Sequence, residues 1–236
     1  MWTGLEAYRP RMDTPFAILL DIDGTLVDSN FLHVDAWQQG FQQAGLTVPA
    51  WRIQRAIGAD SSELLDQLIG SETEAVKNEA KARNAAVFTT LMPRLAPFDG
   101  AREFIRALTE QGNRVVLATS APPEELTALL EVLDVEEHLH AVTSADDVTT
   151  AKPEPDIVHV ALEKGGVDAT QAVMIGDSVW DVIAAAKAGV SCIALLSGGT
   201  GRAELIEAGA IAVFDDIADL HEHAGTRPLR DFLTGL

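Results

Sequence analysis

The chain has 236 residues, enough for one large α/β domain or for a core domain with a smaller insertion. Lys and Arg total 17 against 36 Asp and Glu, the net charge is -19, and no basic block is present, so we expect no nucleic-acid partner. A single cysteine, Cys192, excludes an intramolecular disulfide, and no segment approaches the roughly 18 continuous apolar residues of a membrane helix, so we expect a cytoplasmic protein without membrane contact.

The stretch FAILLDIDGTLVDSN, residues 16–30, places two carboxylates after an apolar run. Residues 16–20 lack amphipathic alternation, which predicts a buried strand of a parallel sheet. Asp21 and Asp23 then lie at the carboxyl edge, where open α/β sheets bind ligands. An Asp-Gly hairpin turn would explain Asp23 but not Asp21, because an uncompensated carboxylate after an apolar run is costly. A bound metal ion would compensate it.

Residues 30–93 carry only helical patterns. FLHVDAWQQGFQQAG has apolar residues at helical spacing up to Gly45, and weaker helical stretches continue to Pro93. No strand-like run interrupts them, which predicts an all-helical cap domain, residues 30–93, inserted into an α/β core made of residues 13–29 and 94–236. The alternative is that these helices extend a single core.

After Asp99 helical and strand patterns alternate. RVVLATS, AVTSA, AVMIGD and SCIALL are typical of strands, and amphipathic helical stretches separate them. This alternation predicts a Rossmann-like, doubly wound parallel sheet with helices on both faces. The segment after Leu220 has no clear pattern.

Polar residues follow three later segments. VVLATS ends in Thr119 and Ser120, AKPEPD places Lys152 before a proline, and AVMIGDSVWD places Asp177 at a strand end with Asp181 four residues later. Each has an ordinary alternative: Ser120 and Asp177 could cap helices, Asp181 could compensate a helix dipole, and Lys152 could be a surface residue.

Together the four stretches resemble, in order, the motifs of the haloacid dehalogenase superfamily, whose DxDGT form marks phosphatases and phosphomutases. The resemblance implies that Asp21 is the nucleophile that accepts the phosphoryl group, and that Asp23 is the acid and base for the leaving group and water. It also implies that Thr119 hydrogen-bonds the phosphoryl group and that Lys152 neutralises both this group and the nucleophile. This chemistry is sensible, because an aspartyl-phosphate splits one displacement into two.

GDSxxD resembles the acidic fourth motif of the superfamily. The resemblance implies a magnesium site in which Asp21, the backbone carbonyl of Asp23 and Asp177 are ligands, with Asp181 as a further carboxylate that reaches the ion through water. Magnesium prefers oxygen ligands in octahedral geometry, which these groups can provide.

The position of the helical insertion, just after DxDGT, is similar to the cap of the phosphoglycolate phosphatase and β-phosphoglucomutase-like branch. His33 lies in the cap-entry segment, where it could assist proton transfer by Asp23 or simply be a polar residue at a hinge. Gly58, Ser61 and Ser62 lie where related caps carry substrate-reading loops.

We therefore expect a monomeric or homodimeric enzyme that hydrolyses a small phosphomonoester, a sugar phosphate or a phosphoglycolate-like metabolite, with magnesium and an aspartyl-phosphate intermediate. The alternative is a β-phosphoglucomutase-like sugar phosphomutase, although the Arg of some mutase caps is not evident. Haloacid dehalogenation is disfavoured because that branch lacks the acid corresponding to Asp23. A non-catalytic binding protein is disfavoured because no member of the catalytic set is missing.

Overall fold

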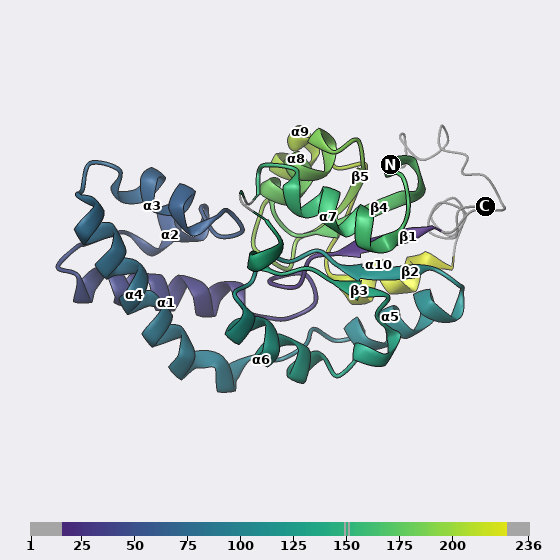
Figure 1. Cartoon of the computed structure of the whole chain (residues 1–236), viewed down its shortest axis with the longest axis horizontal. Helices are drawn as coiled ribbons and strands as arrows, with labels where there is room; N and C mark the ends of the chain where they lie inside the picture. The colour runs from purple at the N-terminus through teal and green to yellow at the C-terminus, as the bar shows by residue number, and fades with distance from the viewer. Residues whose placement is uncertain (1–15, 149, 151, 226–236) are drawn as a thin grey trace.

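A parallel sheet of six strands lies at the centre of the described chain (Figure 1). The computed structural model describes residues 16–148, 150 and 152–225, so the outer limits predicted for the core, residues 13 and 236, lie outside the described residues. The strand order is β3-β2-β1-β4-β5-β6, and all neighbours are parallel. The strands are β1 Ala17–Leu20, β2 Arg114–Leu117, β3 Ala141–Val142, β4 Ala172–Gly176, β5 Ser191–Leu195 and β6 Ala212–Phe214.

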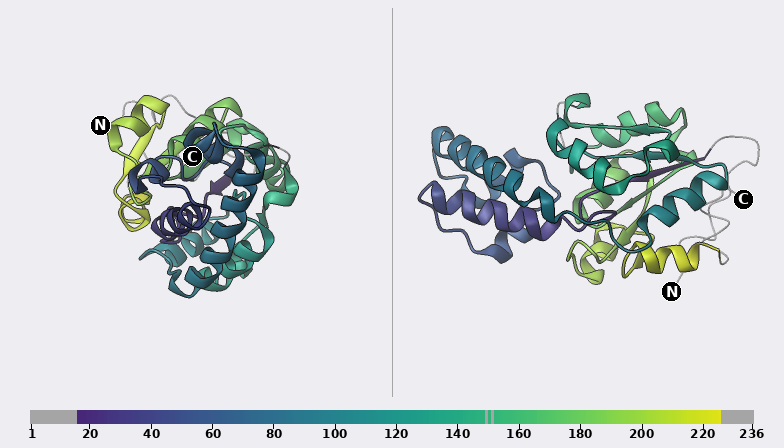
Figure 2. Two further views of the ribbon diagram at one scale, coloured as in Figure 1. Left: turned by 90° about the vertical axis from the view of Figure 1, so that its left-hand side faces the viewer. Right: turned by 90° about the horizontal axis from the view of Figure 1, so that it is seen from below.

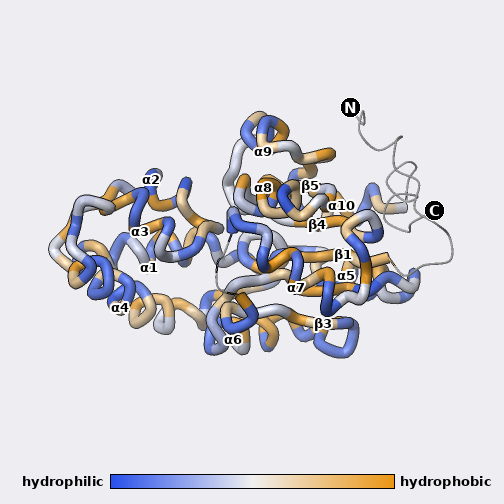
Figure 3. The backbone as a smooth tube through the Cα atoms, turned by 45° about the horizontal axis from the view of Figure 1, so that its top comes forward, coloured by the Kyte–Doolittle hydropathy of each residue, from blue (hydrophilic) through white to orange (hydrophobic). Residues whose placement is uncertain are grey.

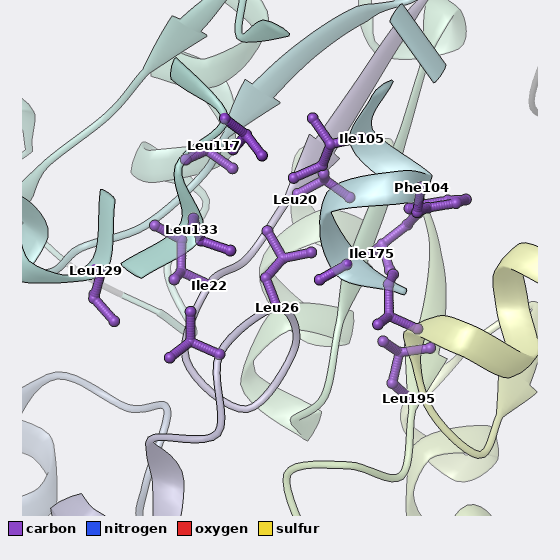
Figure 4. Packing of buried hydrophobic residues seen from close by; sticks show 14 of the residues in the cluster. Leu20, Ile22, Leu26, Phe104, Ile105, Leu117, Leu129, Leu133, Ile175 and Leu195 are labelled. Carbon is purple, nitrogen blue, oxygen red and sulfur yellow. The ribbon is translucent and has the colours of Figure 1, made fainter. Parts of the chain in front are cut away.

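Helices cover both faces of this sheet. Because successive side chains of a strand point to opposite faces, Ile18 and Leu20 of β1 join one buried cluster, while Ala17 and Leu19 join a second. The first cluster, part of which is drawn in Figure 4, includes residues of α5, α6 and α10; the second includes residues of α7, α8 and α9. These helices are α5 Ala101–Glu110, α6 Pro123–Leu133, α7 Asp156–Gly165, α8 Val179–Lys187, α9 Arg202–Ala208 and α10 Ile217–Ala224. The predicted doubly wound α/β fold is confirmed.

The fully buried positions of β1 make the strand costly to disturb. Leu20 has no exposed surface, and truncation of such a side chain to alanine typically costs about 2–5 kcal/mol.

Figure 3 shows hydrophobic colour along the central strands and more hydrophilic colour along α4. No helix among the described residues combines the length and apolarity needed to cross a bilayer.

Between β1 and α5 the described chain forms helices and no strand. The helices lie at one end of the molecule, to the side of the sheet (Figures 1 and 2). Their side chains form a separate buried cluster that includes Trp37, Phe41, Ile53 and Leu64. The helices are α1 Asn30–Gln43, α2 Ala50–Gln54, α3 Ser61–Ile69 and α4 Glu74–Leu91. The division of the chain at residues 30 and 93 stays a prediction.

Two elements near the end of the described chain have no counterpart in the predicted set, strand β6 and helix α10. Asp216 caps α10 by accepting a hydrogen bond from the N–H of Asp219 at 2.8 Å, and Ile217 and Leu220 bury its apolar face. The segment after Leu220 is thus helical as far as Ala224. Short 3-10 turns occupy Met92–Arg94, Glu136–His138, Ala145–Asp147 and Ala169–Gln171.

Candidate active site

The carboxyl ends of β1 and β4 bring two predicted site residues to one edge of the sheet. The strands are parallel neighbours, and Asp21 follows β1 while Asp177 follows β4. The N–H of Asp21 donates to the carbonyl of Ile175 at 2.9 Å, which extends the ladder to this edge. Because β1 lies between β2 and β4, the edge is also the switch point where open α/β sheets bind ligands.

Lys152 lies between two buried carboxylates. Its Nζ is 2.5 Å from Oδ1 of Asp21 and 2.7 Å from Oδ1 of Asp181, and the three side chains are at most 10% exposed. The alternative that Lys152 is an ordinary surface residue is therefore wrong. Carboxylate oxygens of Asp21, Asp177 and Asp181 lie within 4.8 Å of one another. Three carboxylates around one ammonium leave two negative charges, which a divalent cation would neutralise.

Side chains from the first motif hold Asp177 in place. Thr25 Oγ1 donates to Oδ1 of Asp177 at 3.1 Å, and Asn30 Nδ2 donates to Oδ2 at 2.8 Å. The backbone also approaches closely, because a Cβ atom on Gly198 would lie 1.6 Å from Asp177 Oδ2. Gly24 has a φ of +75°, and a Cβ there would lie 2.7 Å from the same oxygen, so both positions require glycine.

Helix α8 is capped by Ser178. Ser178 Oγ accepts the N–H of Asp181 at 3.3 Å, while Asp181 Oδ2 accepts the N–H of Ser178 at 3.1 Å and its hydroxyl at 2.6 Å. This capping box means that the alternative of Asp177 as the helix cap is wrong. Asp181 does serve the helix start, and its second oxygen is the one that faces Lys152.

Burial dominates the electrostatics of these carboxyl groups. It raises the pKa of Asp21 to about 7; the charges of Asp181 and Asp23 act in the same direction, and Lys152 opposes them. The pKa of Asp177 is likewise raised well above its usual value, first by burial and then by the charges of Asp181 and Asp21. Burial lowers the pKa of Lys152, but the two adjacent carboxylates outweigh it and keep the ammonium protonated.

Asp23 is paired with a histidine from α1. Ser29 Oγ donates to Asp23 Oδ1 at 2.6 Å, and His33 Nε2 lies 3.3 Å from the same oxygen. The His33 ring stacks on Phe88 of α4, with ring centroids 4.0 Å apart. Burial opposes ionisation of both partners, yet their mutual hydrogen bond and charge lower the pKa of Asp23 and raise the pKa of His33. The contact places His33 where proton exchange with Asp23 is possible.

A cavity of about 300 Å³ opens above Asp21 between the sheet edge and the helices α1, α3 and α4. Seven predicted site residues line it: Asp21, Asp23, His33, Gly58, Ser61, Thr119 and Lys152. The buried Thr119 accepts a hydrogen bond from the N–H of Ala121 at 3.0 Å, which orients its hydroxyl group. Ser120 also lines the cavity, and the alternative that it caps α6 is wrong because Pro122 occupies that position.

Ser62 is the predicted cap residue that the structure does not bring to this cavity. Asp60 caps α3 by accepting the N–H of Ser62 at 2.7 Å, and Ser62 lies exposed on the first turn. Ser62 thus does not line the cavity, and its role in reading substrate stays a prediction. Gly58 approaches the core closely instead, since a Cβ there would lie 2.9 Å from Ser178 Oγ.

The helical segment also contacts the core beyond the cavity. The Arg55 guanidinium lies 2.7 Å and 3.3 Å from the carboxylate oxygens of Glu204 on α9. Gln54 Nε2 donates to the carbonyl of Gly198 at 3.4 Å, and the N–H of Asp60 donates to the carbonyl of Lys152 at 3.3 Å. Because the ion pair is exposed, it contributes little by itself.

Several site residues were not predicted from the sequence. Thr25, Ser29 and Asn30 fall within the first motif, where buried polar residues next to paired carboxylates were the available signal. Glu125 of α6 and Asn84 of α4 also line the cavity. They belong to helices in which no local pattern separates a cavity-facing polar residue from a solvent-facing one.

The Asp23–His33 contact predicts pH-dependent stability. The pKa of His33 is raised from 6.5, so its contribution is complete below pH 6.5 and is lost as pH rises through the folded-state pKa. The pKa of Asp23 is lowered from 3.8, so its contribution is present above pH 3.8 and is lost as pH falls through the folded-state pKa. We predict that His33→Gln destabilises the protein most between pH 3.8 and 6.5.

Urea unfolding of both proteins between those pH values and at alkaline pH measures this effect, and we expect a difference on the order of 1 kcal/mol between the two conditions. His159→Gln is the matched control, because His159 is exposed on α7. A loss of stability in His33→Gln that does not change with pH would contradict the ion pair.

Comparisons with known proteins agree with this geometry. A family model described as a haloacid dehalogenase-like hydrolase matches residues 17–189. The phosphoglycolate phosphatase of Rhodospirillum rubrum is 31% identical over 221 residues, 89% of this chain and 91% of that protein. A phosphorylated carbohydrates phosphatase of Thermotoga maritima is 30% identical, over 84% of this chain and 93% of that protein. The crystal structure of a hydrolase from Pseudomonas syringae has a TM-score of 0.83 at 29% identity, over 88% of this chain and 97% of that one. The chain thus belongs to the haloacid dehalogenase-like hydrolase family of enzymes, as its motifs predict.

Proposed function

We propose that this enzyme is a magnesium-dependent phosphatase that hydrolyses small phosphomonoesters through an aspartyl-phosphate on Asp21. The observation that carries the proposal is the position of Asp21 in the cavity, with Oδ1 2.5 Å from the ammonium of Lys152. Asp23 lines the same cavity and provides a second carboxyl group for proton transfer. The names of the two phosphatase relatives support a small phosphorylated substrate for this chain as well.

In the first step, a carboxylate oxygen of Asp21 attacks phosphorus and the bond from phosphorus to the leaving oxygen breaks. Asp23 donates a proton to that oxygen, so the product leaves as an alcohol. The Lys152 ammonium and the Thr119 hydroxyl donate hydrogen bonds to the transferring phosphoryl oxygens, which stabilises their negative charge.

In the second step, the Asp23 carboxylate accepts a proton from water, and the water oxygen attacks phosphorus. The bond between phosphorus and Asp21 breaks and inorganic phosphate leaves. Because the pKa of Asp23 is lowered and that of His33 is raised, the shared proton rests on His33 in the free enzyme. His33 therefore transfers its proton to Asp23, and Asp23 then donates it to the leaving oxygen.

The donor set of the site fits magnesium. Asp21 and Asp177 would hold the ion together with the backbone carbonyl of Asp23, and Asp181 would contact it through water. Bound magnesium would neutralise charge on the phosphoryl group and on the carboxylates. Thr25 contributes by fixing the Asp177 carboxylate for this task.

A phosphomutase would use the same residues but return the phosphoryl group to a sugar. The products separate the two reactions: a phosphatase releases one inorganic phosphate for each substrate consumed, whereas a mutase converts one sugar phosphate into its isomer. We expect stoichiometric release of phosphate, with no dependence on a sugar bisphosphate activator.

Residues 30–93 would act as a cap that opens and closes about the connections near Asn30 and Pro93. Closure brings His33 and the loop with Gly58 and Ser61 over Asp21, which excludes bulk water. The contact between Arg55 and Glu204 belongs to the closed arrangement.

We predict that Asp21→Asn lowers turnover at least about a thousandfold, because the nucleophile is lost while side-chain size is kept. Phosphate release from p-nitrophenyl phosphate measures turnover, and circular dichroism checks the fold. Asp28→Asn is the control, since Asp28 is an exposed aspartate of the same stretch. Normal turnover by folded Asp21→Asn would exclude the covalent mechanism.

Magnesium should raise the melting temperature of the metal-free protein, by about 5 °C near saturation, because it relieves repulsion among the buried carboxylates. Asp177→Asn should lose this shift, and Asp28→Asn should keep it. Thermal denaturation with and without magnesium measures it in the absence of substrate. An equal shift in Asp177→Asn would contradict the proposed ligand set.

Ser61→Ala should change the relative kcat/KM among phosphoesters more than it changes kcat/KM for p-nitrophenyl phosphate, which makes few contacts with a cap. Ser62→Ala is the matched control, because the neighbouring Ser62 lies outside the cavity lining. Steady-state kinetics across a substrate panel measures both variants. A uniform factor for all substrates in Ser61→Ala would count against a role for this loop in specificity.

A further inference from the structure

Glu125 of α6 is a half-buried carboxylate in the wall of the cavity. Among the described residues it has no hydrogen bond and no ion pair, although partly buried carboxylates are usually paired. Burial raises the pKa of Glu125, and the nearby charge of Asp23 acts in the same direction, while His33 opposes them. The protein itself therefore leaves this carboxyl group without a donor.

The position of Glu125 relates it to the leaving group of the reaction. It lines the same cavity as His33 and Asp23, the groups that would handle the proton of the leaving oxygen. Glu125 therefore adds a further carboxyl group, without a partner of its own, to the part of the wall that holds His33 and Asp23. A substrate substituent close to the leaving oxygen would therefore lie near the Glu125 carboxyl group.

A second acceptor lies in the same wall. The side-chain carbonyl oxygen of Asn84 on α4 is buried and has no hydrogen-bond partner among the described residues. Trp37 and Leu64 provide apolar surface between the polar groups, which suits the C–H faces of a carbohydrate. The cationic Lys81 lines the cavity too, but it is exposed to solvent and its charge is screened.

Resting on the proposed phosphatase activity, we propose that Glu125 is a specificity-determining residue that selects phosphomonoesters of polyhydroxy compounds, sugars and polyols, over phosphorylated 2-hydroxy acids. In a sugar phosphate, the carbon next to the ester carbon commonly carries a hydroxyl group, which can donate to Glu125. In a phosphorylated 2-hydroxy acid a carboxylate occupies that place, and it has no proton to donate and repels Glu125.

Two probes with one carbon skeleton isolate this effect. Beside the ester carbon, 2-hydroxyethyl phosphate carries a hydroxymethyl group, whereas 2-phosphoglycolate carries a carboxylate. We expect the wild-type enzyme to favour 2-hydroxyethyl phosphate by at least about tenfold in kcat/KM. Glu125→Gln removes the charge and keeps the shape, so it should lower this ratio about tenfold, mainly through faster turnover of 2-phosphoglycolate.

Glu124→Gln is the matched control, since Glu124 precedes Glu125 on the same helix, is exposed and does not line the cavity. It should leave the ratio unchanged, and p-nitrophenyl phosphate, which carries neither group, should be hydrolysed by wild type and by Glu124→Gln at the same rate. A wild-type preference for 2-phosphoglycolate would overturn the role of Glu125, and so would an unchanged ratio in Glu125→Gln. In either case, hydrolysis of p-nitrophenyl phosphate by wild type would still support the phosphatase activity. Failure of wild type to hydrolyse any of the three esters would overturn the proposed function itself.

Discussion

The buried contact of Lys152 with Asp21 and Asp181 is the constraint on which the site depends. Removal of charges from water is expensive, and loss of one partner from such a pair typically costs about 3–5 kcal/mol. The cost is offset here because Lys152 Nζ lies 2.5 Å from Asp21, at the end of β1, and 2.7 Å from Asp181, in the first turn of α8. With Asp177 added, the cluster keeps a negative excess that suits a metal ion. This excess is the feature from which the proposed cation site follows.

The fold divides the chemical task between its parts. The sheet edge positions Asp21 and Asp177 directly after β1 and β4, which are joined by backbone hydrogen bonds. Lys152 comes from the turn before α7, and Asp181 comes from the first turn of α8. The helical segment supplies His33, which pairs with Asp23, and covers the cavity above Asp21. A displacement of the helices would therefore alter the proton-transfer pair and the substrate walls but leave the contact of Lys152 with Asp21 in place.

The strand ends explain why much of the site could be predicted from the sequence. An apolar run that terminates in Asp21 or Asp177 is a local signal, and topology brings such ends together. Contacts between distant segments left no such signal. The hydrogen bond from Asn30 to Asp177, and the cavity wall that Glu125 shares with His33, depend on how α1 and α6 pack. Strand β6 and helix α10 were missed, and both are short, with three and eight residues.

The covalent intermediate provides the most direct test. Turnover of p-nitrophenyl phosphate should be stopped with acid, and the digested protein mapped by mass spectrometry, with Asp23→Asn included because loss of the base slows breakdown of the intermediate. We predict a phosphoryl group on the peptide that contains Asp21, present during turnover and gone when substrate is exhausted. Phosphate release without any phosphorylated peptide in either protein, or a phosphoryl group on another residue, would contradict it.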